Sequence, residues 1–320
     1  MNCTEAKNYR HIFIVNPNTS RMPVIEVLIQ RIKNVCNEEE LIYEVFRANS
    51  PEAGPEHIRD LARAGFPLRV YICGGDGTVR NIISSTWNYK NVEYGVIPMG
   101  TGNDFARNFG TKEDYASLKN IIMGDTVDID LMQVNGQVYV NMLNIGFDEQ
   151  VVSMVQRWRH IPFSRNQIAY TIAAFIQLLR MPMEHLKITF DDGKVLDKRF
   201  TLCAIANGSY CGGGYFAASN ASVDDGLMDV LVVRPIRRKH FLQMIGDYRK
   251  GTLLNTKKGK KLVFQKKCSK VILEKKTPFE VCFDGEIEKT KRLECEIIPK
   301  AVKFIKPAKS LSCAQTSANK

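Results

Sequence analysis

Two glycine-rich segments that each contain an aspartate are the part of this chain best suited to chemistry. They are residues 74–78, GGDGT, and residues 100–104, GTGND, and each follows a short apolar run typical of a buried strand. Glycines at strand ends let backbone N–H groups approach an anion without hindrance from Cβ atoms. A lone aspartate would repel phosphate, so Asp76 and Asp104 are expected to act through a hydrated divalent cation. The two segments together predict phosphoryl transfer.

The elements that position these segments alternate between strand and helix up to about residue 130. The predicted strands are residues 11–15, 41–46, 68–73 and 94–98, and the predicted helices are 23–35, 55–64 and 79–87. This alternation predicts a parallel, doubly wound α/β sheet. Ligands of such sheets bind at the carboxyl ends of the strands, where residues 16–20 and both glycine-rich segments fall.

After about residue 130 the pattern changes to short alternating strands, separated by turn signals such as DDG at 191–193. The predicted strands include residues 186–190, 200–206, 228–233 and 261–264, and a helical insertion interrupts the series at about 150–181. This half is predicted to be an antiparallel β-sandwich or barrel-like domain. The predicted domains are therefore residues 1–130, with a segment at about 299–306 packing back on them, and residues 131–298. The polar tail at 307–320 is expected to be disordered.

The composition is that of a soluble globular protein, with 44% hydrophobic and 25% charged residues. No apolar run is long enough to cross a bilayer, and residues 1–10 lack the apolar core of a signal peptide, so a cytoplasmic location is expected. The nine cysteines are scattered without a C-x-x-C pair, and a thiol metal site is therefore not expected.

The net charge of +11 is concentrated between residues 237 and 267. This stretch lacks the interleaved aromatic residues of a single-strand-binding platform, and the chain contains no recognisable nucleic-acid-binding module, so no nucleic acid partner is expected. Two interpretations stay open, a solvated basic face and contact with an anionic membrane surface. The sequence does not decide the oligomeric state, and a homodimer stays open as one alternative.

Residues 74–78, together with PMGTGNDFAR at 98–107, resemble the diacylglycerol kinase catalytic domain. Downstream motifs place the resemblance in the bacterial soluble lipid kinase branch. These motifs are NIGFD at 144–148, NG at 207–208 with GGG at 212–214, DDG at 224–226 and DGE at 284–286. The resemblance runs from residue 16 to about residue 299. It implies an ATP-binding α/β domain, a β-rich lipid-binding domain and an active site in the cleft between them.

The resemblance also implies a nucleotide site, with Mg²⁺ arranged through water by Asp76 and Asp104. The implied ATP contacts are Asn16, Pro17, Asn18, Thr19, Ser20, Asn49, Gly75, Asp76, Gly77, Thr78, Val79, Arg80, Asn81 and Thr101. The chain departs from the family at Ser20, where glycine is usual, and at Arg80 and Asn81, where Asn-Glu is common. A helix-capping role is the alternative for Thr78 and for Asp104.

Phosphoryl transfer to an alcohol needs a carboxylate that accepts the hydroxyl proton. The resemblance implies Glu286 as this general base, with Asp284 beside it to orient the base or the metal; a plain hairpin turn is the alternative for this D-G pair.

The resemblance implies a second, structural Mg²⁺, held by the carboxylate of Asp225 and the carbonyls of Ser222 and Leu227. Mg²⁺ favours such oxygen-only, partly hydrated coordination. Asp225 is alternatively a turn residue, and Ser219 stands where the family usually has proline.

The predicted protein is an ATP-dependent lipid kinase that phosphorylates the hydroxyl of a neutral lipid, with diacylglycerol giving phosphatidic acid as the default reaction. It is expected in the cytoplasm, bound peripherally and reversibly to the inner face of the membrane. The alternatives are an NAD-kinase-like enzyme with a soluble acceptor and a non-catalytic nucleotide- or lipid-binding relative.

Overall fold

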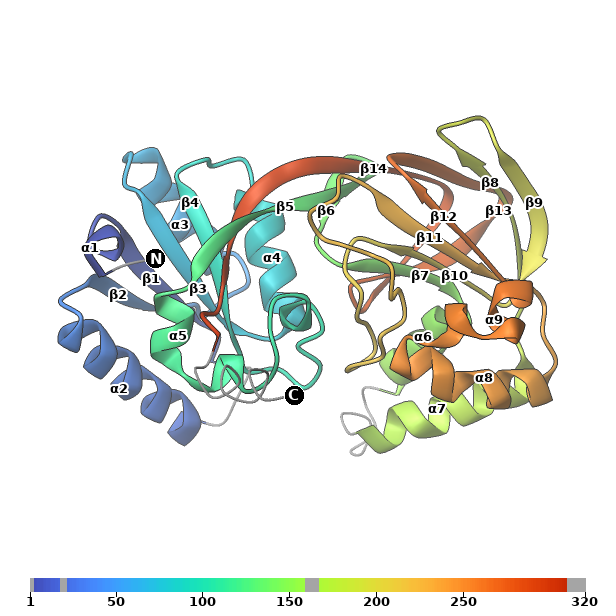
Figure 1. Cartoon of the computed structure of the whole chain (residues 1–320), viewed down its shortest axis with the longest axis horizontal. Coiled ribbons are helices and arrows are strands. Elements are labelled where there is room, and N and C mark those ends of the chain that lie inside the picture. The colour runs from blue at the N-terminus through green and yellow to red at the C-terminus, as the bar shows by residue number, and fades with distance from the viewer. Residues whose placement is uncertain (1–2, 18–21, 159–166, 310–320) are drawn as a thin grey trace, which may run out of the picture. The chain divides into compact units, whose positions relative to one another are not determined.

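The computed structural model describes residues 3–17, 22–158 and 167–309 of the chain. Two compact units emerge, residues 1–129 with 300–320 and residues 130–299 (Figure 1). The chain passes from one unit to the other in strands β5 (Asp125–Val134) and β14 (Glu286–Lys306). The predicted disordered tail starts at residue 307, but Pro307 is buried and the N–H of Ala308 donates to the carbonyl of Asn120 at 2.9 Å. The rest of the tail, residues 310–320, and the nucleotide predictions for Asn18, Thr19 and Ser20 lie outside the described residues.

The first unit is built on a parallel sheet with the strand order β4-β3-β1-β2. Its elements are α1 (Cys3–Ala6), β1 (Arg10–Val15), α2 (Met22–Glu38), β2 (Ile42–Arg47), α3 (Ala53–Arg63), β3 (Leu68–Gly74), α4 (Asp76–Thr86), β4 (Val92–Pro98), η1 (Ala106–Asn108), η2 (Asp114–Ala116) and α5 (Leu118–Ile122). Near the end of β14, Lys303 and Phe304 pair in parallel with β4.

Helices cover both faces of this sheet because successive side chains of each buried strand point to opposite sides. On one face, Phe13 and Val15 of β1 share a core with apolar residues of α2 and α5. On the other face, Gly54 of α3 packs so closely that an added Cβ would lie 3.0 Å from Cγ2 of Ile14. The strand order reverses between β1 and β3, which is the position where doubly wound sheets bind ligands. The predicted doubly wound α/β fold is confirmed.

The second unit is mainly antiparallel, with the strand order β12-β11-β10-β7-β13-β14. A β8-β9 hairpin adds to β13. Its further elements are β6 (Gln137–Tyr139), β7 (Met142–Gly146), α6 (Phe147–Arg157), α7 (Gln167–Arg180), β8 (Glu184–Phe190), β9 (Val195–Phe200), β10 (Leu202–Ala206), β11 (Met228–Val233), α8 (Arg238–Lys250), η3 (Leu253–Asn255), α9 (Lys257–Leu262), β12 (Val263–Cys268) and β13 (Lys270–Phe283).

Strand β13 makes this unit a sandwich because its two halves pair with different neighbours. Its first half pairs with β8 and its second half with β7, and the register against β14 shifts between Glu274 and Phe279. Apolar side chains from both groups of strands, such as Ile188 of β8 and Ile205 of β10, form one core. The outer face of β10 and β11 packs against the segment that contains α8. The predicted β-sandwich is confirmed.

Two local predictions differ from the structure. Residues 261–264 were expected to be a strand, but α9 extends to Leu262, and the hydroxyl of Thr256 caps that helix by accepting the N–H of Gly259 at 2.9 Å. The helical insertion begins earlier than predicted, with α6 at Phe147, and α7 follows it. Among the described residues, no helix is both long enough and apolar enough to cross a membrane.

Candidate active site

The two glycine-rich segments touch at their backbones. Strands β3 and β4 are neighbours, with Gly74 opposite Pro98, so the residues that follow them meet. A Cβ on Gly75 would lie 3.0 Å from Cα of Gly100, and a Cβ on Gly100 would lie 2.6 Å from Cα of Gly75. Both positions therefore require glycine for packing, in addition to the anion-binding reason expected from the sequence.

We expect Gly100→Ala to lower the free energy of unfolding by about 1–3 kcal/mol, because the new methyl group forces two backbone segments apart. Gly77→Ala is the matched control, since an added Cβ there meets nothing within 4 Å and alanine favours the first turn of α4. Urea unfolding of both variants measures the difference. Equal stabilities for the two variants would contradict the close contact between the segments.

The carboxylates of Asp76 and Asp104 converge on Gly102. A Cβ on Gly102 would lie 3.0 Å from Oδ2 of Asp76 and 3.3 Å from Oδ2 of Asp104. Asp76 is the first residue of α4, and its Oδ1 accepts the N–H of Phe105 at 3.0 Å. Asp104 is only 8% exposed. Two carboxylates this close repel each other, and a bound divalent cation would relieve that repulsion with the oxygen ligands that Mg²⁺ prefers.

Two residues that the sequence analysis did not single out position this segment. Asn103 has a φ of +51°, its Oδ1 accepts the N–H of Gly100 at 2.9 Å, and its Nδ2 donates to the carbonyl of Gly100 at 2.7 Å. Arg107 donates from Nε and Nη2 to the carbonyl of Gly102 at 3.3 and 3.2 Å, and its Nε lies 3.7 Å from Oδ1 of Asp104. An asparagine among glycines was the available signal for Asn103, because asparagine tolerates positive φ.

The last residues of β14 pack against the same segment. Phe304 of β14 stacks on Phe109 with ring centroids 4.0 Å apart, and it meets the edge of Phe105 at 5.4 Å. Phe105 is fully buried, and its N–H is the one that Asp76 accepts. The backbone N–H that binds the carboxylate of Asp76 therefore belongs to a residue that is packed in an aromatic cluster.

The helix that carries Asp76 begins at the switch point of the sheet. Gly75 is the N-cap of α4, and the amide of Asn16, at the end of β1, donates to Oγ1 of Thr78 at 3.1 Å. The alternative capping role for Thr78 is therefore wrong, because the helix starts before it. The short helix η1 has Phe105 as its N-cap, so Asp104 lies one residue before that cap. A helix N-terminus favours bound anions through its N–H groups and its dipole.

Three predicted nucleotide residues lie within α4. Val79 faces the core and Arg80 is half-buried on α4. Asn81 donates from Nδ2 to the carbonyl of Pro51 at 2.6 Å, which links α4 to the segment after β2. The amide at position 81, one of the departures from the family pattern, thus has a positioning contact.

Three further predicted residues show less definite surroundings. Asn49, which follows β2, and Thr101, which follows β4, are exposed. Pro17, which follows β1, is half-buried. The structure therefore brings together Asn16, Asp76 and Asp104 at the carboxyl ends of β1, β3 and β4 in the first unit.

In the second unit, Glu286 follows a two-residue hairpin turn between β13 and β14. Asp284 and Gly285 have φ values of +44° and +94°, and Phe283 pairs with Glu286, as in a type I′ turn. The carboxylate of Asp284 accepts the N–H groups of Met142 at 2.9 Å and Val140 at 3.3 Å. Asp284 thereby anchors the turn after which Glu286 begins β14, with its side chain exposed.

The turn that was expected to hold a structural Mg²⁺ contains an ion pair. The Nζ atom of Lys267 lies 2.6 Å from Oδ2 of Asp225 and 2.7 Å from Oδ2 of Asp229, and Asp229 is fully buried. The backbone N–H of Leu227 donates to the other oxygen of Asp225 at 3.1 Å. The side chain of Ser222 bonds to Asp224. An ammonium group already lies on the one carboxylate of the expected metal site, so these residues fit an internal ion pair better than a metal.

Lys267→Met is expected to destabilise the protein by about 3–5 kcal/mol, because it leaves the buried carboxylate of Asp229 without its cation. Lys187→Met on β8 is the control, since the side chains of its ion pair with Glu274 are 47% and 35% exposed to solvent. Thermal melts with and without EDTA test the metal directly. A loss of stability on adding EDTA to the unsubstituted protein would show that a metal ion, and not the Lys267 ammonium, stabilises this turn.

Two acidic residues at the start of α6, the half-buried Asp148 and the buried Glu149, had no role predicted from the sequence. Burial raises the pKa of Asp148 to about 6, against the hydrogen bond that it accepts from the Tyr248 hydroxyl at 3.1 Å. Burial, followed by the neighbouring Glu280, raises the pKa of Glu149 to about 8. Their position directly after the NIGF sequence was the available signal.

Asp148→Asn is expected to stabilise the protein by about 1–3 kcal/mol at pH 8 and to have little effect below pH 4. The folded chain disfavours the ionised form, so stability present at low pH is lost as the pH rises from 3.8 towards 6. In Glu149→Gln the gain should keep growing up to about pH 8. Melting temperatures across this range measure both. A pH-independent effect of Asp148→Asn would contradict its raised pKa.

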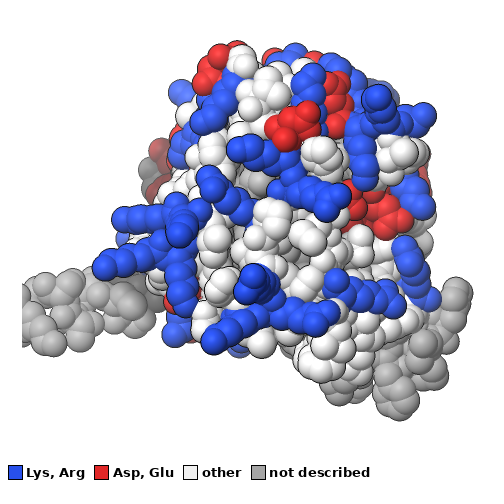
Figure 2. All heavy atoms as spheres, turned by 90° about the vertical axis from the view of Figure 1, so that its right-hand side faces the viewer, with Lys and Arg blue, Asp and Glu red and all other residues white. Residues whose placement is uncertain are grey.

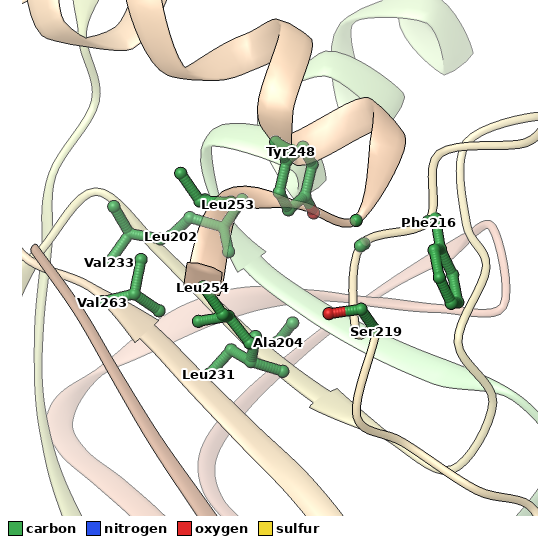
Figure 3. Close-up of a pocket in the computed structure, with 12 residues that line it drawn as sticks. Leu202, Ala204, Phe216, Ser219, Leu231, Val233, Tyr248, Leu253, Leu254 and Val263 are labelled. Carbon is green, nitrogen blue, oxygen red and sulfur yellow. The ribbon is translucent and has the colours of Figure 1, made fainter. Parts of the chain in front are cut away.

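A narrow apolar cavity lies between α8 and the outer face of the sheet (Figure 3). Leu202 and Ala204 of β10 and Leu231 of β11 line one side, while Tyr248 and Leu253 line the other. A second cavity adjoins it along α8 and reaches Asp148, Phe241 and Met244. The walls are almost entirely apolar, and Asp148 and Tyr248 add polar groups.

Comparisons with known proteins bear on both units. The family model "Diacylglycerol kinase catalytic domain" matches residues 10–134, and "YegS C-terminal NAD kinase beta sandwich-like domain" matches residues 141–306. A crystal structure of a diacylglycerol kinase from Bacillus anthracis aligns with a TM-score of 0.70 at 20% identity, covering 93% of this chain and 97% of that one, and shows the same fold.

Curated relatives carry kinase names. A "Probable lipid kinase YegS-like" protein of Shewanella frigidimarina is 28% identical over 75% of this chain and 76% of its own length. A "Diacylglycerol kinase" of Bacillus subtilis is 25% identical over 85% of this chain and 88% of its own. One from Mycobacterium tuberculosis is 30% identical over 61% of this chain and 64% of its own. The chain belongs to the family of bacterial lipid kinases that have a diacylglycerol kinase catalytic domain followed by a YegS-type β-sandwich domain.

Proposed function

We propose that this lipid kinase transfers the γ-phosphate of ATP to the hydroxyl group of diacylglycerol, which yields ADP and phosphatidic acid. The observation that carries the proposal is the convergence of Asp76 and Asp104 on Gly102 at the N-terminus of α4. Paired carboxylates can bind a divalent cation, and a helix N-terminus can bind phosphate. The two features side by side therefore fit a polyphosphate that carries a bound metal ion.

The first unit supplies the nucleotide half of the proposed reaction. The N-terminus of α4 and the glycine segments would bind the phosphates, and Asn16 would orient Thr78 towards them. Asp76 and Asp104 would hold Mg²⁺, which when bound neutralises charge on the transferred group. Asn103 and Arg107 keep the second carboxylate in place through their contacts with Gly100 and Gly102.

The second unit supplies the acceptor half. Glu286 would accept the proton of the lipid hydroxyl. The hydroxyl oxygen would form a bond to the γ-phosphorus while the bond between that phosphorus and the oxygen of ADP breaks. Asp284 does not need to take part in proton transfer, because backbone N–H groups occupy its oxygens; it positions the turn that carries Glu286.

A lipid acceptor is favoured over a soluble one by the cavity beside α8. Its lining of Leu, Val, Ala and Phe side chains suits an acyl chain and offers little to a dinucleotide. The cavity is narrow, so the proposal requires α8 to move outward when a chain enters.

The test is phosphorylation of a lipid panel by the purified protein with γ-labelled Mg-ATP. Diacylglycerol, monoacylglycerol and ceramide are offered in detergent mixed micelles, and NAD is offered in solution. We expect label in the chloroform phase with diacylglycerol as the preferred acceptor. Label confined to the aqueous phase would refute the lipid acceptor, and preference for another lipid would refute diacylglycerol.

A further inference from the structure

Helix α7 carries apolar side chains on a buried face and on an exposed face. Ala169 and Ala173 are buried against α6, in a cluster with Val151 and Val155. The exposed face carries Ile172 (48%), Phe175 (59%) and Leu179 (50%), which recur at helical spacing. A surface helix normally places polar residues there, so these side chains are not accounted for by the fold of the unit.

Basic residues lie beside one end of this exposed apolar stripe. Arg180 ends α7, and Arg238 at the start of α8 donates to the carbonyl of Leu179, which places the exposed Arg237, Arg238 and Lys239 beside the stripe. Leu242, one turn further along α8 than Arg238, is 58% exposed. Helix α8 therefore adds an exposed apolar side chain to the basic residues at its start, which lie beside the end of α7.

The described residues of α7 and α8, which carry this surface, include a single acidic side chain. Residues 167–179 contain no charged residue, and Asp247 is the only acidic residue between 237 and 267. Figure 2 shows that Lys and Arg side chains outnumber Asp and Glu on the face of the second unit that it presents. A surface that joins apolar side chains to a one-sided positive rim complements an anionic bilayer, which offers acyl chains below acidic headgroups.

We propose that the exposed face of α7, with Leu242 and the basic residues 237–239, is the surface by which this kinase docks on an anionic membrane. Ile172, Phe175 and Leu179 enter the acyl boundary while the arginines and the lysine bind headgroups. Docking is peripheral because only the exposed face of the helix meets the membrane, and such a helix lies in the membrane interface without crossing the bilayer. This inference rests on the proposed lipid acceptor, because it brings the enzyme to the layer that contains such a substrate.

Flotation of the full-length protein with vesicles tests the surface. We expect binding to vesicles of phosphatidylcholine with phosphatidylglycerol and much weaker binding to phosphatidylcholine alone. Phe175→Ser combined with Leu179→Ser should weaken binding by at least about tenfold. Changing residues 237–239 to glutamine should weaken it on the order of a hundredfold at low salt. Val27→Ser, at a 60% exposed apolar position on α2, is the matched control and should bind normally.

Several outcomes would overturn the docking surface. Equal binding to both kinds of vesicle would show that headgroup charge does not contribute to docking. Normal binding by the Phe175 and Leu179 variant would show that the exposed face of α7 does not contact the membrane. Light scattering that shows a dimer of the unsubstituted protein, and a monomer for that variant, would assign the stripe to a second copy of the chain.

The proposed function can fail separately. Activity on diacylglycerol in detergent micelles does not need docking, so we expect the Phe175 and Leu179 variant to retain it. Vesicle binding by a protein that phosphorylates no lipid would count against the proposed function alone.

Discussion

Glu286→Gln is expected to lower kcat by on the order of 10²- to 10⁴-fold, with ATP affinity and melting temperature unchanged. Glutamine has nearly the same shape and cannot accept a proton at neutral pH. The side chain is exposed at the first position of β14, and the turn before it is held by Asp284 and by Gln156, whose Nε2 donates to the carbonyl of Gly285 at 2.9 Å. The substitution therefore removes the proposed base without disturbing its support.

Glu288→Gln is the matched control for this substitution. Glu288 lies two residues further along the same strand, and its Oε1 accepts the hydroxyl of Tyr139 at 3.2 Å, a bond that glutamine can also accept. Steady-state kinetics with saturating diacylglycerol and Mg-ATP should give near-normal kcat for this control. A normal kcat in Glu286→Gln would show that another group accepts the proton.

Asp76→Asn is expected to reduce kcat/KM by on the order of 10²- to 10³-fold and to raise the Mg²⁺ concentration needed for activity. Asparagine can still accept the N–H of Phe105, so the packing around Phe304 should remain. The change removes one of the two negative charges beside Gly102. The expected loss therefore arises from weaker metal binding and not from unfolding.

Asp60→Asn is the control for this second substitution, because Asp60 is an exposed aspartate on α3 of the same unit, with only a 3.9 Å pair to Arg63. Activity is measured over a Mg²⁺ titration, and folding by circular dichroism melts. An unchanged Mg²⁺ requirement in Asp76→Asn would contradict the assignment of the paired carboxylates to the metal.

The parallel sheet and the position of its acidic residues were predictable because buried parallel strands appear as continuous apolar runs. The runs before residues 74 and 100 became β3 and β4, and the order of strands and helices was enough to place their ends together. The glycines were predicted for anion access, whereas the structure adds a second reason, the contact between Gly75 and Gly100.

Features that depend on long-range partners were not predictable. Arg69 lies inside an apolar run, yet it is 2% exposed because Glu93 on the neighbouring strand and two backbone carbonyls satisfy its guanidinium. The pair of Lys267 with Asp229 likewise depends on the register between β11 and β12. A single sequence contains these residues without indicating which pairs will meet.

The helices of the second unit illustrate the same limit. A lysine-rich stretch at 257–262 has no apolar periodicity to mark it as helix, but the Thr256 cap and the close packing of Gly259 on the carbonyl of Leu253 fix α9 there. The apolar periodicity of α7 was visible, but only the structure separates its buried face from its exposed one.

Phosphoryl transfer to diacylglycerol is tested by measuring ADP and phosphatidic acid together in a reaction of the purified protein with Mg-ATP and diacylglycerol. The proposed transfer predicts that the two products form in equal amounts with the unsubstituted chain and that both nearly vanish in Glu286→Gln. Formation of ADP without phosphatidic acid, or of phosphatidic acid at an undiminished rate in that variant, would contradict the account.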